Sequence, residues 1–309
     1  MNETVFIEKF PTPIQAKATD DPIEILRFAE EQFQRGAVAV AMLVSIRGGA
    51  ARSPGSLIAV AADGSYCGFV SGGCIESTVA FEALLAISQG KDRVVMFGQG
   101  SPFFDIVLPC GGGLTVAIHV LRTASVLRFV LERLERRQPA GVRYSPRNQV
   151  LAPTDPPAQS GWIEEDFLSA YRPRTRVVIS GRSLEAQMLA RCATVLDFDV
   201  TRLESADGDY VARAIDAYTA VVLLHHDLDA EKRILAAALA SPAFYIGALG
   251  STRTHAKRIE MLASSGVSKA DIERIKAPIG LFGPARDSAS LALSVLAEIA
   301  AVRQDIGEQ

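Results

Sequence analysis

The stretch RVVISGRSLEA, residues 176–186, decides the fold of the C-terminal half of this 309-residue chain. Its first five residues form a short apolar run typical of a buried strand, and Gly181 follows at once. A helical pattern begins near residue 184. A strand, a glycine loop and a helix in this order open the βαβ unit of nucleotide-binding folds, where the loop reads G-x-G-x-x-G.

The loop at residues 181–186 is a degenerate version of that fingerprint. Gly181 keeps the first glycine, Ser183 replaces the second and Ala186 replaces the third. Glu204 lies about twenty residues further on, where an acidic ligand of a ribose belongs. Because the second glycine lets a pyrophosphate approach the backbone, Ser183 argues against tight dinucleotide binding. The sequence therefore predicts a Rossmann-like fold more firmly than NAD(P) binding.

The rest of the C-terminal half continues the alternation of strands and helices. Residues 199–203 should form the next strand, and continuous apolar runs at 220–224 and 244–248 are typical of parallel strands buried on both faces. A helix with apolar residues along one side, 291–302, ends the pattern. We predict a doubly wound parallel sheet over residues 174–309. The helix after residue 183 should bury Leu184, Met188, Leu189, Cys192 and Val195.

Two further loops follow predicted strands in this half. One of His225 and His226 could act with Asp227 as an acid–base pair or a metal ligand, and the alternative is a loop histidine that caps a strand. The loop from residue 247 to 255 either caps a helix or holds an anion at its N-terminus. Parallel strands would bring this loop and the 181–186 loop to one edge of the sheet. Its candidate cofactor-binding residues are Gly247, Gly250, Ser251, Arg253 and His255.

Two cysteine–glycine loops mark the N-terminal half, VSGGCIE at 70–76 and LPCGGG at 108–113. The first leads into a helical pattern, so Cys74 should lie near a helix N-terminus. Such loops let backbone N–H groups close on an anionic ligand while a thiol stands at the rim. The alternative is a tight turn around a small buried cysteine. The candidate residues are Gly72, Gly73, Cys74, Cys110, Gly111 and Gly112, with Cys110 the preferred functional thiol and Cys74 the second.

The chain should contain two domains joined by a connecting segment. Apolar runs and helical patterns predict a complete α/β domain over 1–137. Residues 138–173 carry six prolines and should connect the domains, with one or two short strands. Residues 174–309 then form the Rossmann-like domain.

The composition is that of an ordinary globular protein. Hydrophobic residues make up 49% of the chain and charged residues 22%. The net charge of −3 argues against non-specific nucleic-acid binding. The four cysteines show no zinc-ligand spacing and predict free thiols rather than a disulfide framework. The longest apolar run, Ala37 to Ile46, is too short to span a membrane, and no secretion signal is evident, so we expect a cytoplasmic protein.

Taken together, these motifs resemble the xanthine dehydrogenase accessory (XdhC/CoxI) family. In the N-terminal domain the matching pieces are RSPG at 52–55 and the two cysteine–glycine loops. In the C-terminal domain they are YIGALGS at 245–251 with RTH at 253–255, and APIGL at 277–281 with Arg286. One departure is the loop GRSL at 181–184, where the family reads closer to G-A-G-H.

The resemblance implies a maturation role. Proteins of this family are thought to bind the molybdenum cofactor (molybdopterin), protect it during sulfuration and help insert it into a xanthine dehydrogenase-type enzyme. The implied partners are that molybdoenzyme and a cysteine desulfurase or sulfurtransferase, and the sequence leaves a homodimer open. A cofactor-binding chaperone is thereby favoured over an enzyme. Two alternatives stay open: an NAD(P)-dependent oxidoreductase using the C-terminal domain, and a scaffold that only bridges two partners.

Overall fold

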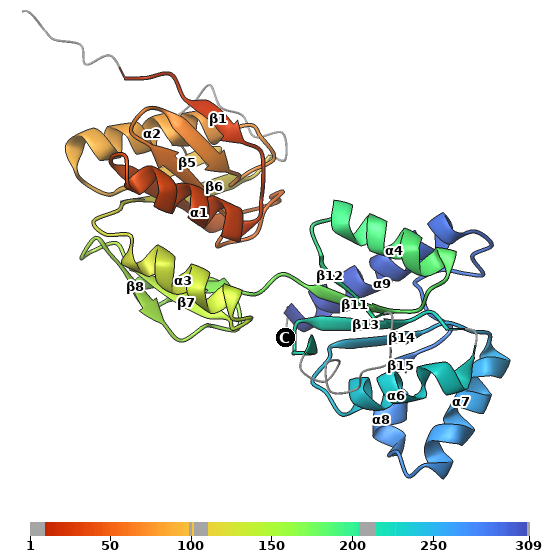
Figure 1. Cartoon of the computed structure of the whole chain (residues 1–309). Helices are drawn as coiled ribbons and strands as arrows, with labels where there is room; N and C mark the ends of the chain where they lie inside the picture. The colour runs from red at the N-terminus through yellow and green to blue at the C-terminus, as the bar shows by residue number, and fades with distance from the viewer. Residues whose placement is uncertain (1–9, 99–100, 102–110, 204–213, 226, 308–309) are drawn as a thin grey trace, which may run out of the picture. The chain divides into compact units, whose positions relative to one another are not determined.

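The structure is a computed structural model that describes residues 10–98, 101, 111–203, 214–225 and 227–307 (Figure 1). It divides into two compact units, Met1–Arg172 and Pro173–Gln309. Within the described part of the chain, no helix is long and apolar enough to cross a membrane. Each unit has its own sheets and its own hydrophobic cores.

The first unit is built on a six-stranded sheet with the order β1-β4-β3-β2-β6-β5. All neighbouring strands are antiparallel except β1 and β4, which are parallel. The strands are β1 (Ile14–Lys17), β2 (Val38–Arg47), β3 (Leu57–Ala61), β4 (Ser65–Gly68), β5 (Arg93–Gly98) and β6 (Gly113–Val120). The helices of this unit are α1 (Pro22–Phe33), α2 (Glu76–Gln89) and α3 (Ser125–Glu135).

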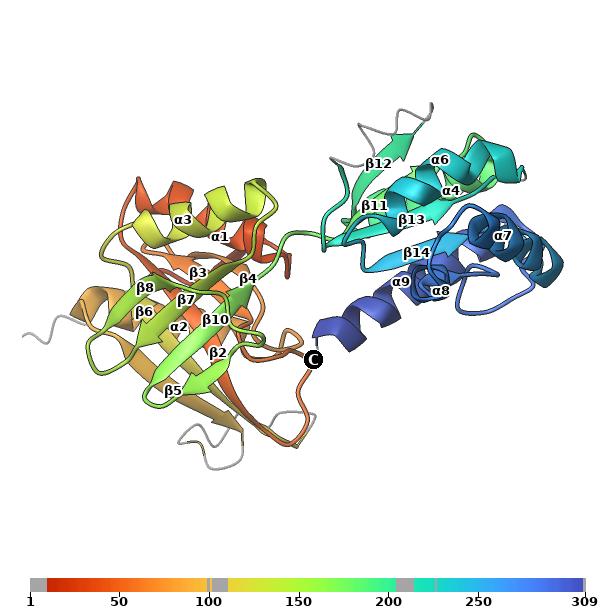
Figure 2. The ribbon, with the colours of Figure 1, turned by 90° about the horizontal axis from the view of Figure 1, so that it is seen from below.

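The central strand β2 shows why this sheet is buried on both faces. Its alternate residues Val38, Val40 and Met42 belong to one core, while Ala39, Ala41 and Leu43 belong to the other. Helix α2 covers the second core, and α1 and α3 contribute to the first (Figures 1 and 2). Helix α1 begins after Asp21, whose side chain accepts a hydrogen bond from the Ile23 N–H at 2.9 Å and so caps the helix.

Residues 138–173, predicted to connect two domains with one or two short strands, have more structure than that prediction gave them. They form a four-stranded antiparallel sheet of order β8-β7-β10-β9, which belongs to the first unit. Its strands are β7 (Ala140–Ser145), β8 (Val150–Thr154), β9 (Gly161–Ile163) and β10 (Asp166–Tyr171). The prolines that suggested a connecting segment lie outside the strands or, as Pro153 does, in β8, an edge strand of the kind where sheets tolerate proline.

The packing of this small sheet explains its stability. Phe167 and Tyr171 point into the core that α1 and α3 share with β2. Trp162 packs edge-to-face on Phe167 and donates a hydrogen bond from Nε1 to the Val44 carbonyl at 2.9 Å. The lone tryptophan therefore ties the small sheet to the large one.

The second unit is the predicted doubly wound Rossmann-like domain. Its five strands are all parallel, in the order β12-β11-β13-β14-β15. The strands are β11 (Arg176–Ser180), β12 (Asp199–Leu203), β13 (Thr219–Leu223), β14 (Tyr245–Ala248) and β15 (Ile275–Lys276). The helices are α4 (Leu184–Val195), α6 (Leu228–Leu239), α7 (Thr252–Ser264), α8 (Lys269–Glu273) and α9 (Ser288–Gly307).

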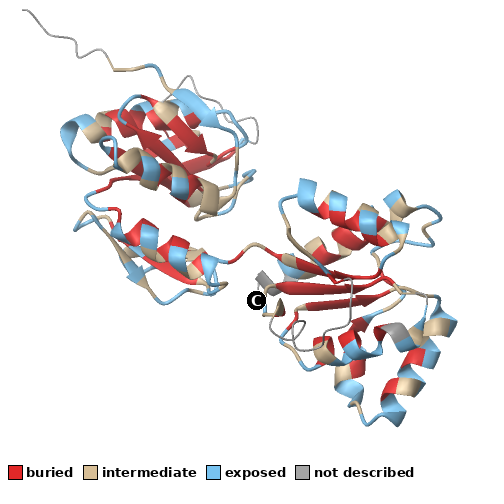
Figure 3. Ribbon diagram, in the orientation of Figure 1, coloured by how far each residue is buried: buried red, intermediate tan, exposed pale blue. Residues whose placement is uncertain are grey.

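Helices cover both faces of this sheet. Helices α4 and α9 pack in the core on one face, and α6, α7 and α8 pack in the core on the other (Figures 1 and 3). The predicted buried face of α4 is partly wrong, since Leu184 and Val195 are exposed. The buried positions are instead Ala186, Leu189, Ala190 and Ala193, because three small side chains let α4 approach α9 closely.

Gly181 is required by the neighbouring strand. Its backbone has a φ of 138°, which side-chain-bearing residues rarely adopt. A Cβ at this position would lie 2.7 Å from the carbonyl oxygen of Leu224, just beyond β13. The glycine at the start of this degenerate loop is therefore accounted for by close packing, independently of any nucleotide.

We predict that Gly181→Ala destabilises the second unit by about 2–6 kcal/mol, since backbone strain and a steric clash each cost about 1–3 kcal/mol. The matched control is Gly266→Ala, where φ is also positive (82°) but nothing lies within 4 Å. That variant should lose only the strain, about 1–2 kcal/mol. Urea unfolding followed by circular dichroism, with Trp162 fluorescence reporting on the first unit, measures both. If both variants lose the same free energy of unfolding, the contact of residue 181 with Leu224 is unimportant.

Candidate functional site

Three loops of the first unit meet at one end of the six-stranded sheet. Strand β2 ends at Arg47, β4 ends at Gly68 and β6 begins at Gly113, so the chain between these strands gathers at this end. A Cβ added to Gly72 would lie 3.6 Å from the Cβ of Ala51. A Cβ added to Gly112 would lie 2.7 Å from the Gly49 carbonyl oxygen. Gly72 of the first glycine loop and Gly112 of the second therefore both pack against residues 47–51.

A buried carboxylate holds the first cysteine loop together. Glu76, the first residue of α2, is only 3% exposed. Its Oε1 accepts hydrogen bonds from the N–H groups of Val70 (3.2 Å) and Ser71 (2.7 Å), and its Oε2 accepts from the Ile75 N–H (3.1 Å). The Ser71 hydroxyl lies 2.8 Å from both carboxylate oxygens. This carboxylate fixes the backbone on both sides of Cys74.

The N–H groups of Val70, Ser71 and Ile75, which flank the candidate residues of this loop, already have a partner within the chain. Their partner is the chain's own Glu76. The N–H groups of Gly73 and Cys74 also point inward, to the Ser71 hydroxyl at 3.2 and 3.3 Å. A buried carboxylate satisfies the amides at the helix start, so the group this loop offers to a ligand is the thiol.

Cys74 is the accessible thiol among the cysteines that the structure describes. It is exposed, whereas Cys67 is buried and Cys192 is half-buried. Its Sγ lies 3.4 Å from the Ser71 hydroxyl. Burial raises the pKa of the Cys67 thiol to about 11, with smaller opposing effects of neighbouring charges, so Cys67 is inert at neutral pH. Cys110, the preferred thiol in our prediction, lies outside the described residues; Gly111, next to it, is exposed.

Arg52 is a residue of this end of the sheet that was not among the predicted site residues. Its guanidinium lies over the Phe69 ring, 5.7 Å from the centroid, and forms an ion pair with Asp20. Its Nε is buried and makes no hydrogen bond with the part of the chain described here. The signal in the sequence was the RSPG motif that carried the family resemblance. It places a cation one residue from Ala51, which packs on the thiol loop.

The second unit contains a separate cavity of about 700 Å³. Three segments line it: the loop from β14 into α7, the loop before α9, and Leu291 of α9. Gly250 and Ser251 are the predicted residues that belong to this lining. Most of the remaining lining is apolar, and it includes the exposed side chains of Leu281 and Phe282.

The other predicted residues of this unit have structural roles or lie elsewhere. Ser183 and Ser251 are helix N-caps, accepting from the N–H groups of Ala186 (3.4 Å) and Thr254 (3.2 Å). A Cβ on Gly247 would lie 2.6 Å from Ile279. Gly181 and Ser183 share the sheet edge with the 247–255 loop but are not among the described residues that line the cavity. Glu204 lies outside the described residues.

Arg253 and His255 lie on α7 and do not line the cavity within the described chain. Arg253 is exposed. His255 buries an Nδ1 atom that has no partner in the described chain, and burial lowers the pKa of this imidazole, as does the nearby charge of Arg258. Arg258 is fully buried, pairs with Glu231 of α6, and donates from Nη2 to the Leu249 carbonyl at 2.8 Å. This ion pair fixes the start of the cavity-lining loop, and sequence reasoning missed it.

In the motif at the end of β13, His225 and Asp227 make separate contacts. His225 Nε2 lies 2.6 Å from the Ser180 hydroxyl, between strands β11 and β13 where the strand order reverses. Asp227 caps α6 by accepting from the Asp229 N–H at 3.0 Å, and His226 lies outside the described residues. No group of three potential metal-ligating side chains occurs among the described residues.

The fold and the loops define a two-unit α/β protein with a thiol-bearing glycine loop and a separate Rossmann-like unit. Comparison with known proteins shows which family has this combination of units. Residues 177–299 match the XdhC Rossmann domain, and residues 33–98 match the XdhC and CoxI family. The chain is 49% identical over 297 residues to the molybdenum cofactor insertion chaperone PaoD of Escherichia coli, covering 96% of this chain and 93% of PaoD. The chain therefore belongs to the XdhC and CoxI family.

Two more distant proteins are also similar to this chain. The uncharacterized protein YqeB of Escherichia coli is 23% identical over 86% of this chain, which spans 44% of YqeB. A Bacillus halodurans protein, described with its crystal structure as a xanthine dehydrogenase, shares the fold with a TM-score of 0.72. It is 18% identical, and the match covers 92% of this chain and 96% of that one.

We predict that Glu76→Gln loosens the thiol loop. The amide nitrogen would face N–H or O–H donors, and one unsatisfied buried group costs about 1–3 kcal/mol. Hydrogen exchange of residues 70–76 should therefore become faster. The matched control is Glu82→Gln on the same helix, which loses an ion pair with Arg93 (2.7 Å) but touches no residue of the loop. Unchanged exchange in Glu76→Gln would show that the carboxylate does not hold the loop.

Proposed function

We propose that this protein is a molybdenum-cofactor maturation chaperone that binds the cofactor and assists its insertion into a xanthine dehydrogenase-type molybdoenzyme. The similarity to PaoD over almost the whole length of both chains supports this role. The observation that carries the proposal is the exposed Cys74 thiol, held on a loop whose backbone is fixed by Glu76.

The chemistry of this thiol suits the cargo. A thiolate is a soft ligand and matches a sulfur-rich metal centre better than oxygen ligands do. Ser71 and Glu76 fix the position of Cys74, so little conformational entropy is lost when the cargo binds. Because the thiol is exposed on one loop, the cargo can leave toward a client enzyme without unfolding of the chaperone.

The proposal includes the partners that the family resemblance implies. A sulfurtransferase would deliver sulfur to the cargo while this protein shields it. The client would be a molybdoenzyme of the xanthine dehydrogenase type. The apolar cavity with Gly250 and Ser251 stays a predicted cofactor contact, and its size falls in the range of small-molecule sites, about 300–1,000 Å³.

The alternative function, an NAD(P)-dependent oxidoreductase, is not part of our proposal. That alternative used Gly181 and Ser183 as the phosphate loop. Contact with Leu224 accounts for Gly181, and capping of α4 accounts for Ser183. Neither residue requires a dinucleotide to explain its presence.

The direct test is anaerobic binding of molybdenum cofactor released from a purified molybdoenzyme, with bound pterin and molybdenum both measured. We predict that Cys74→Ser weakens binding about tenfold or more, the usual cost of disturbing a metal's surroundings. The matched control is Cys192→Ser, which removes a half-buried thiol from α4 of the other unit and should bind at the wild-type level.

A third variant for the same binding measurement is Cys110→Ala, because Cys110 is the thiol that the sequence favours. Loss of binding in Cys110→Ala with full binding in Cys74→Ser would overturn the assignment to Cys74 while keeping the function. Absence of pterin and molybdenum from the wild-type protein would contradict the proposed function itself.

A further inference from the structure

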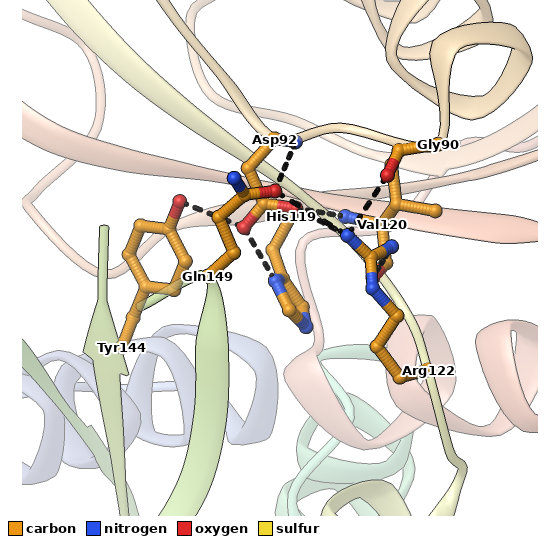
Figure 4. Close-up of polar contacts among 7 residues, drawn as sticks. All are labelled: Gly90, Asp92, His119, Val120, Arg122, Tyr144 and Gln149. Carbon is orange, nitrogen blue, oxygen red and sulfur yellow. Dashed lines mark hydrogen bonds and ion pairs between the residues drawn. The ribbon is translucent and has the colours of Figure 1, made fainter. Parts of the chain in front are cut away.

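A buried polar cluster lies in the first unit, outside the thiol loop (Figure 4). The Asp92 carboxylate, just before β5, accepts hydrogen bonds from His119 Nδ1 (2.7 Å), the Tyr144 hydroxyl (3.0 Å) and the Val120 N–H (3.1 Å). His119 lies on β6 and Tyr144 on β7, so Asp92 links the large sheet to the small one. Burial opposes ionisation, but these donors outweigh it and lower the pKa of Asp92.

His119 faces a cavity of about 210 Å³. The imidazole is only 3% exposed, and its Nδ1 is used by Asp92. Its Nε2, at the opposite end of the ring, points away from Asp92 (Figure 4) and makes no hydrogen bond with the described residues. Nε2 is not among the fully buried atoms of the described chain, so water or a ligand in the cavity can supply its hydrogen-bond partner.

Both polar and apolar residues line this cavity. Besides His119, the polar ones are Arg122, Thr123 and Gln149. The volume equals that of about seven water molecules at about 30 Å³ each, which fits a small organic molecule. The apolar ones are Leu121, Val126, Val150 and Leu151.

The charges around the cavity are nearly balanced without a ligand. Asp92 is negative, and Arg122 Nη2 lies 3.6 Å from its Oδ1. Arg122 is held in place by donating to the carbonyls of Val120 (2.8 Å) and Gly90 (3.1 Å). The groups facing His119 are thus Asp92, Arg122 and the neutral Tyr144, whose pKa is raised by burial and then by Asp92. A ligand with one negative charge, entering together with one proton on Nε2, keeps this balance.

We propose that this cavity binds a small monocarboxylic acid with an aliphatic or aromatic body. The proton is held on His119 Nε2, which donates a charge-assisted hydrogen bond to the carboxylate, while Nδ1 stays with Asp92. The apolar body packs on the four aliphatic side chains. A dianion such as phosphate would leave one uncompensated charge in a partly apolar site and should not bind.

The test uses the full chain and isothermal titration with isobutyrate and benzoate, alongside their neutral amides and inorganic phosphate. Both acids should bind at least tenfold more tightly than their amides. In the ¹⁵N spectrum, the Nε2 signal of His119 should move to the protonated position on benzoate binding.

Two variants test whether the acid binds in the cavity that His119 lines. His119→Gln removes the donor and should weaken acid binding at least tenfold. Val150→Trp fills the cavity from an exposed position, leaves the Asp92–His119 pair intact, and should abolish binding in a folded protein. Equal binding of acid and amide, or wild-type binding in Val150→Trp, would overturn the proposal. Preferential binding of phosphate would overturn the ligand class.

Discussion

The buried carboxylate of Glu76 is the interaction on which the N-terminal site depends. It accepts hydrogen bonds from residues on both sides of Cys74 and is the first residue of α2, so it joins loop and helix. A buried charge is stable only when its oxygens are satisfied, and here the donors all come from one loop. The loop therefore has one conformation, in which Gly72 and Gly73 bear no side chain and Cys74 is exposed.

The same principle recurs in other parts of both units. Asp92 ties the two sheets of the first unit, and the Glu231–Arg258 pair fixes the cavity loop of the second. In each case a buried charge is paired with groups distant in sequence. Such contacts are weak sources of stability but restrict the backbone to one arrangement, which suits sites that must be preformed.

Much of the fold could be predicted from the sequence, because strands buried on both faces read as continuous apolar runs. Residues 38–46 and 220–224 are examples, and they became β2 and β13. The small sheet at 140–171 was missed, since its prolines lie between strands or at an edge. The thiol loop was found, but the role of Glu76 was not, because nothing local shows that a helix-starting glutamate folds back onto preceding amides. Asp92, His119 and Tyr144 are brought together only by tertiary structure.

The central claim is that the Cys74 thiol binds the molybdenum of the cargo. The measurement that tests it most directly is the molybdenum K-edge X-ray absorption spectrum of the cofactor bound to the full chain. The account predicts one more sulfur ligand than in the free cofactor, absent in Cys74→Ser and retained in Cys192→Ser. Identical molybdenum coordination in the wild-type protein and in Cys74→Ser would contradict it.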